Sequence, residues 1–82
     1  MKKTMNEERE YTDERDTVKY FCNSVTDYRK YYNLTIPKMA ELLGLSRSYV
    51  FKMETGDVKV SLFTAQKIAN ALGVKLIDLL PE

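Results

Sequence analysis

Few side chains in this 82-residue sequence could carry out covalent chemistry. There is no histidine, which removes the commonest general base and the commonest metal ligand, and Cys22 is the one cysteine. Cys22 falls on the apolar face expected of a helix, so a small buried thiol is the favoured interpretation. A chain of this length can build one small core, but not a core and a deep catalytic cleft. These observations argue against an enzyme, a cofactor or a metal site, and they predict a binding protein.

Hydrogen-bond donors suited to recognition occur instead between residues 47 and 52. Arg47 can pair through two hydrogen bonds with guanine, and Ser48 can bond to a base or to a phosphate. Lys52 lies about one helical turn beyond Ser48 and shares its face. The net charge is only +1, so affinity for nucleic acid would depend on where the basic residues lie and not on their number. The alternative is that Arg47, Lys52 and Lys59 form an ordinary solvated face.

The composition is that of an ordinary globular domain. Hydrophobic residues make up 44% and charged residues 30% of the chain, as in folded soluble proteins. No apolar run is long enough to span a bilayer, and the basic start MKKTMNEERE is not followed by the apolar stretch of a signal peptide. We therefore expect a cytoplasmic protein without a membrane partner. Residues 1–12 are expected to form an arm that is partly disordered or helical, and residues 13–82 a single domain.

Helical spacing dominates the pattern, and no strand-like alternation appears between the turns, so the fold is predicted to be all-α. The first helix is predicted to be long and amphipathic, with Thr12 or Asp13 as its cap. The lack of proline and glycine in residues 1–36 leaves an earlier start open. Its apolar stripe follows spacings of three and four and consists of Val18, Phe21, Cys22, Val25, Tyr28 and Tyr32.

Four further helices are predicted, two of them over about residues 36–43 and 47–55 and a last short one before the carboxyl end. Pro37 falls in a first turn, where its missing amide proton is not needed. The predicted caps are Thr35, Ser46 and Ser61, and the predicted stops are Gly44, Gly56, Gly73 and Pro81. The residues expected to be buried are Ile36, Met39, Ala40, Leu43, Val50, Met53, Leu62, Ala65, Ile68, Ala69 and Leu72. The last short helix is expected to hold Leu76, Leu79 and Leu80.

The second and third predicted helices are joined by a three-residue turn, Gly44-Leu45-Ser46, which is typical of a helix-turn-helix. Ala40 supplies the small side chain needed where these helices cross. The segments LTIPKMAELLGLSRSYVFKMETG and SLFTAQKIANALGVKLIDLL resemble the phage-repressor (Cro-like, or XRE-type) helix-turn-helix family. The resemblance covers roughly residues 20–80. It implies a five-helix, repressor-like domain, usually dimeric on a palindromic operator, here with an N-terminally extended first helix.

The resemblance also implies roles for particular side chains. The positions implied to face duplex DNA are Arg47, Ser48, Tyr49 and Lys52, and those implied to lie near the phosphate backbone are Thr55 and Lys59. In the family pattern an arginine of the first helix pairs with a glutamate of the third helix. Arg29 and Glu54 match these two positions. The family pattern therefore implies an ion pair that clamps the recognition helix to the first helix.

Three features depart from the usual pattern of the family. Ile36 stands where a glutamine commonly braces the recognition helix or contacts phosphate. The loop after Gly56 has the sequence DVKVS, in which Asp57 would repel phosphate, whereas the family often has basic residues and a proline there. Phe51 replaces a residue that is usually polar on or beside the DNA face. Its ring could contact a thymine methyl group or fold back onto the protein.

The chain also carries more aromatic residues than its core needs, and Tyr20, Tyr31 and Phe63 are candidates for a partner surface. The first predicted function is sequence-specific duplex DNA binding by a small transcriptional regulator, expected to be a repressor, with the helix at about residues 47–55 in the major groove. The alternative is a protein-interaction module or antitoxin on the same scaffold, using these aromatics or the acidic segment from Glu7 to Asp16.

A homodimer is expected at least on DNA. One recognition helix with so few basic residues offers too little affinity for a single half-site. The predicted dimer contact consists of Leu76, Ile77, Leu80 and Phe63.

Overall fold

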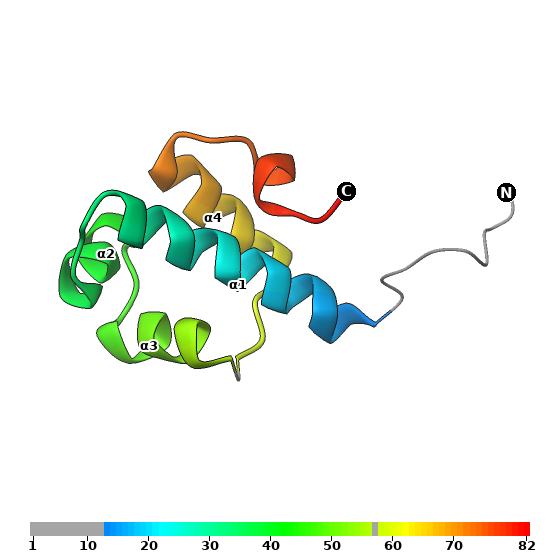
Figure 1. Cartoon of the computed structure of the whole chain (residues 1–82), viewed down its shortest axis with the longest axis horizontal. Helices are drawn as coiled ribbons and strands as arrows, with labels where there is room; N and C mark the ends of the chain where they lie inside the picture. The colour runs from blue at the N-terminus through cyan, green and yellow to red at the C-terminus, as the bar shows by residue number, and fades with distance from the viewer. Residues whose placement is uncertain (1–12, 57) are drawn as a thin grey trace, which may run out of the picture.

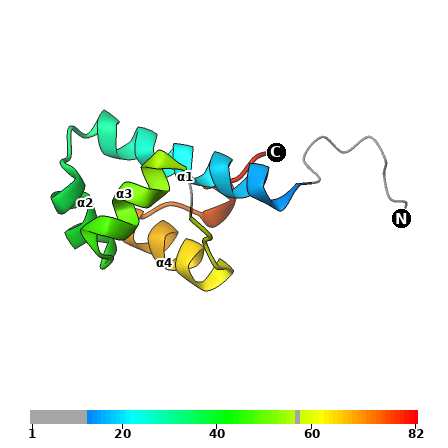
Figure 2. The same ribbon diagram turned by 90° about the horizontal axis from the view of Figure 1, so that it is seen from below.

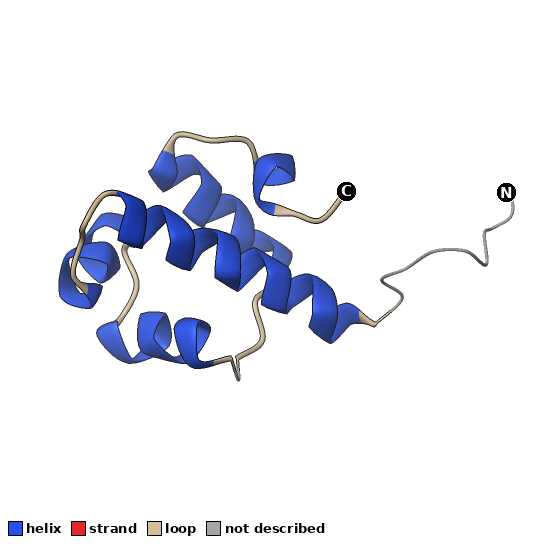
Figure 3. Ribbon diagram, viewed as in Figure 1, coloured by secondary structure: helices blue, strands red, loops and turns tan. Residues whose placement is uncertain are grey.

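The computed structural model describes residues 13–56 and 58–82, and these residues form four α-helices and one short 3-10 helix (Figures 1 and 3). The elements are α1 (Glu14–Tyr31), α2 (Ile36–Leu43), α3 (Arg47–Thr55), α4 (Leu62–Leu72) and η1 (Leu76–Leu79). No strand occurs in the described residues, in agreement with the predicted all-α class. The predicted arm at residues 1–12 lies outside them, as does Asp57.

Each α-helix begins at a side chain that accepts a hydrogen bond from a free amide of the first turn. Thr35, Ser46 and Ser61 accept from the backbone N–H three residues ahead, which confirms the three predicted caps. Asp13 caps α1 by accepting from the N–H of Arg15 at 2.9 Å. The backbone of Asp13 is extended (ψ 122°), so α1 begins at Glu14 and not earlier. Hydrogen bonds from Arg15 hold the pKa of the Asp13 carboxyl below its ordinary value.

Gly44 ends α2 in the left-handed conformation, with φ +69°, as predicted. Its N–H donates to the carbonyl of Glu41, and the following N–H, that of Leu45, donates to the carbonyl of Ala40 at 3.0 Å. The Nζ of Lys67, on α4, donates to the carbonyl of Gly44 at 3.2 Å. The turn between α2 and α3 is therefore bonded both to its own helix and to α4.

A single core joins all five elements. α2 packs against α3 and α4, while α1 packs against α3 and η1 (Figures 1 and 2). The buried residues are Phe21, Cys22, Val25, Met39, Ala40, Leu43, Val50, Met53, Ala65, Ile68, Ala69, Leu72 and Leu79. Burial raises the pKa of the Cys22 thiol, which is consistent with the buried thiol predicted. No helix in the described part of the chain is long and apolar enough to cross a bilayer.

The fifth predicted helix is a 3-10 helix of four residues, so the predicted count of five α-helices is not confirmed. Its bonds span three residues: Asp78 donates from its N–H to the carbonyl of Lys75, and Leu80 donates to the carbonyl of Ile77. Lys75 precedes it without a side-chain cap. Between the glycine turn after α4 and Pro81 there is too little chain for an α-helix to gain many bonds. Within this segment, Leu79 is buried in the core.

Two residues expected in the core are instead exposed. Leu62 is 76% exposed because it is the first residue of α4, one turn before the first buried position of that helix. Tyr32 is 55% exposed because α1 ends at Tyr31, so the helical spacing no longer applies to it. The Tyr32 ring packs against Tyr28, with centroids 4.7 Å apart. Tyr28 is half-buried and donates its hydroxyl to the carbonyl of Leu72 at the end of α4.

Candidate nucleic-acid interface

The helices α2 and α3 and the turn Gly44–Ser46 form a rigid unit. The α3 side chains Val50 and Met53 are buried against the core, with 1% and 2% of their surface exposed. Ala40 is 3% exposed on α2, which agrees with the small side chain predicted where the helices cross. The orientation of α3 is therefore determined by close packing and not by the turn alone.

The outer side of α3 carries the exposed residues of the helix. These residues are Arg47, Ser48, Phe51, Lys52 and Thr55. At 100° per residue their positions span less than half of the helix circumference, so they share one face. The structure thus brings together four of the six residues that the sequence assigned to DNA. Thr55 donates its hydroxyl to the carbonyl of Phe51 at 3.0 Å, which leaves an oxygen lone pair but no free donor.

Tyr49 lies apart from this face. It is half-buried against the core, and its hydroxyl donates to the backbone carbonyl of Lys59 at 3.1 Å. Burial is the main cause that raises the pKa of Tyr49. This contact ties α3 to the segment that carries the exposed Lys59 side chain. Sequence reasoning placed Tyr49 toward DNA and missed this bond, because a contact between residues ten apart leaves no local signal.

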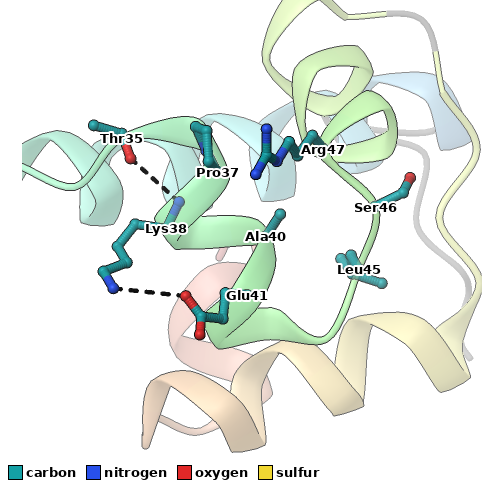
Figure 4. Close-up of a pocket in the computed structure, with 8 residues that line it drawn as sticks. All are labelled: Thr35, Pro37, Lys38, Ala40, Glu41, Leu45, Ser46 and Arg47. Carbon is teal, nitrogen blue, oxygen red and sulfur yellow. Dashed lines mark hydrogen bonds and ion pairs between the residues drawn. The ribbon is translucent and has the colours of Figure 1, made fainter.

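A groove runs between the first turns of α2 and α3 (Figure 4). Its lining consists of Thr35, Pro37, Lys38, Ala40, Glu41, Leu45, Ser46 and Arg47. The Arg47 side chain extends from α3 toward Pro37 on α2 (Figure 4). The Nζ atom of Lys38 lies 3.6 Å from Oε1 of Glu41, and both side chains are largely exposed. Lys38 was not among the predicted site residues, although its place in the first turn of the first motif helix could have suggested it.

Ile36, at the first position of α2, is half-buried and packs against the core. The position at which the family commonly has a glutamine therefore serves packing in this chain. Any polar contact from the start of α2 must come from neighbouring groups such as Thr35 or Lys38.

Behind the motif, Arg29 of α1 and Glu54 of α3 form a two-point ion pair. Arg29 donates from Nε and Nη2 to the Glu54 carboxylate at 2.5 and 3.0 Å. Its Nη1 donates to the carbonyl of Leu34 at 2.6 Å. The two side chains are 17% and 14% exposed. The hydrogen bond to Glu54 raises the pKa of Arg29 above its ordinary value. The pair thus links α1, α3 and the loop before α2.

Two short packed helices, a three-residue turn and an exposed polar face on the second helix define a helix-turn-helix protein. The sequence profile of the helix-turn-helix family HTH_3 matches residues 26–79, and the chain belongs to this family. The XRE-type resemblance inferred from the sequence is therefore confirmed. The family consists of DNA-binding transcriptional regulators and is not normally enzymatic.

The chain is also similar in sequence or structure to individual regulatory proteins. An uncharacterized HTH-type transcriptional regulator of Methanocaldococcus jannaschii is 40% identical over 57 residues, which cover 70% of this chain and 86% of the relative. The restriction-modification controller protein C.AhdI of Aeromonas hydrophila is 34% identical with a TM-score of 0.67, and the match covers 76% of this chain and 94% of that one. An HTH_3 family transcriptional regulator of Vibrio cholerae has a TM-score of 0.74 at 22% identity. That match covers 82% of this chain and 38% of the Vibrio protein, and it supports the fold alone.

Proposed function

We propose that this protein is a sequence-specific duplex DNA-binding regulator that acts as a repressor, with α3 in the major groove. The observation that carries the proposal is the exposed face of α3, on which Arg47, Ser48 and Lys52 lie together. An α-helix fits the major groove, where each base pair presents a distinct pattern of donors and acceptors. Close packing and the Arg29–Glu54 pair hold this face in a fixed orientation.

Within this proposal the exposed cations have two different tasks. Arg47 and Lys52 are on α3 and can reach base edges, with Arg47 suited to two hydrogen bonds with a guanine. Lys59 follows the helix, and Lys38 stands across the groove at the start of α2. These two residues would contact phosphates, which gives affinity and orientation but little sequence preference.

Arg47→Ala and Lys59→Ala test this division. Arg47→Ala is expected to lose roughly 1 to 3 kcal/mol on the preferred site and to relax the preference at one base pair, because the lost bonds go to a particular base. Lys59→Ala should weaken all duplexes about equally and lower the salt slope by about one unit per site, because one fewer counterion is released. The measurement is binding to matched and singly substituted duplexes, chosen by selection from random sequences, at several salt concentrations.

Lys30 is an exposed lysine on α1, and Lys30→Ala is the control. It should change neither the base preference nor the salt slope. If Arg47→Ala weakened every duplex alike and left the base preference intact, α3 would not be the recognition element.

We also infer a homodimer on DNA, for which two exposed apolar side chains are available on α4 and η1. Phe63 on α4 and Ile77 in η1 are 81% and 72% exposed. Leu76 and Leu80, included in the predicted contact, are half-buried and pack against the core. In such an interface Leu76 and Leu80 would connect the contact surface to the core. The exposed Phe63, Ile77 and Leu62 would form the contact surface itself.

Phe63→Ser should weaken self-association more than tenfold, because burial of an aromatic ring contributes about 1.5–3 kcal/mol. Tyr31→Ser, at an equally exposed aromatic residue on α1, is the matched control. Sedimentation equilibrium, free and with operator, measures the effect. A wild-type protein that stays monomeric in both conditions would contradict the dimer, and an equal effect of both variants would place the contact elsewhere.

One observation favours the alternative function, a protein-interaction module. Tyr31 and Tyr32 form an exposed edge-to-face pair, with centroids 4.9 Å apart, at the end of α1. Exposed aromatic residues are enriched at protein interfaces. Salt-dependent binding to duplex DNA separates the two functions, because counterion release is expected only of the DNA-binding protein.

A further inference from the structure

Phe51 is an exposed aromatic residue in the middle of the otherwise polar α3 face. Its side chain is 55% exposed and does not belong to the buried core or to the apolar residues packed against it. More than half of the residue's surface is therefore left in contact with water. Leaving such a ring in water forgoes the stabilisation that burial of apolar surface provides, on the order of 25 cal/mol per Å².

The surroundings of Phe51 restrict what could cover it. Arg47 and Ser48 precede it by one helical turn, Lys52 is next to it, and Thr55 follows one turn later. All four are exposed, and the Lys52 and Arg47 side chains are cationic. A matching surface must therefore offer one apolar group among hydrogen-bond acceptors and negative charge. An apolar protein surface would leave the polar groups of Arg47, Ser48 and Lys52 without partners, at a cost.

The major groove of DNA has this combination of groups. Its base edges present acceptors, its rims are phosphates, and the C5-methyl group of thymine is its one apolar feature. Phenylalanine is among the side chains suited to contact that methyl group. We propose that Phe51 is a specificity-determining residue that contacts the methyl group of a thymine in the operator. This proposal rests on the proposed function and adds a preferred base to it.

Replacement of thymine by deoxyuridine tests the contact, because it removes the methyl group and keeps every hydrogen-bonding group. Each thymine of the preferred duplex is replaced in turn, and affinity is measured for the wild-type chain, for Phe51→Ala and for Ser48→Ala. At one position in each half-site the wild-type chain should lose about fourfold in affinity, the value of one buried methyl group. Phe51→Ala should bind the parent duplex about tenfold more weakly and lose nothing further at that position.

Ser48→Ala is the matched control, one helical turn away on the same face, and it should retain the sensitivity to deoxyuridine. Because Phe51 is exposed, its replacement should leave the thermal unfolding transition nearly unchanged. If Phe51→Ala kept the same loss at every deoxyuridine position, or if the wild-type chain lost nothing at any of them, the thymine contact would be excluded while DNA binding stood. If the wild-type chain bound no duplex in preference to another, the proposed function itself would be overturned.

Discussion

Leu43→Ala is expected to lower the free energy of unfolding by about 2–5 kcal/mol, the usual cost of emptying a well-packed leucine site. Leu43 is 1% exposed and is the last residue of α2. It belongs to the core, and its helix packs against both α3 and α4. The loss combines the transfer energy of the missing methyl groups with the cavity they leave. Urea denaturation followed by circular dichroism measures it, and the midpoint should fall without a change in slope.

Leu42 provides an unusually close control for this experiment. It is the same residue type, on the same helix and one position away, but it is 45% exposed. Leu42→Ala should cost less than about 1 kcal/mol, because nearly half of the Leu42 surface is already in contact with water in the folded protein. Equal losses in the two variants would contradict the assigned helical phase of α2.

Arg29→Ala should lower the free energy of unfolding by about 3 kcal/mol, a loss similar to that of Leu43→Ala. The substitution leaves the Glu54 carboxylate and the Leu34 carbonyl without the donors that now satisfy them. A mostly buried charge without a partner costs more than the net value of the pair, because its desolvation is no longer offset. Glu54→Ala should show a similar loss, since it strands the guanidinium instead.

Two further variants sharpen this test. Arg29→Lys keeps the charge but cannot make the two-point bond and the carbonyl bond together, so it should recover only part of the stability. Lys38→Ala removes one member of an exposed pair and should cost less than about 1 kcal/mol. Unchanged stability in both Arg29→Ala and Glu54→Ala would show that the two residues do not stabilise one another in solution.

Much of the helical framework could be predicted from the sequence because its signals are local. A cap such as Ser46 bonds to an amide three residues away, and a glycine such as Gly44 reports the left-handed turn that it occupies. The inward positions of α3, Val50 and Met53, follow from the helical repeat. The exposed positions Arg47 and Lys52 follow from the same repeat.

The predictions of burial and helix type were wrong at the ends of elements. Tyr32 and Leu62 were assigned to the core by extending the helical repeat to positions where the helix stops or only begins. η1 was predicted as an α-helix because the spacing of its leucines does not distinguish an α-helix from a 3-10 turn over four residues.

The sequence by itself determined the all-α class, the caps and turns of the motif and the face of α3 that carries Arg47, Ser48 and Lys52. Only the tertiary structure decided which side chains of α3 make contacts within the protein and which remain exposed for a partner. It engages the Tyr49 hydroxyl with the Lys59 carbonyl, and it leaves the Phe51 ring exposed. The physical reason is that these outcomes depend on which distant backbone and side-chain groups pack nearby, and such neighbours are set by the assembled core and not by local spacing.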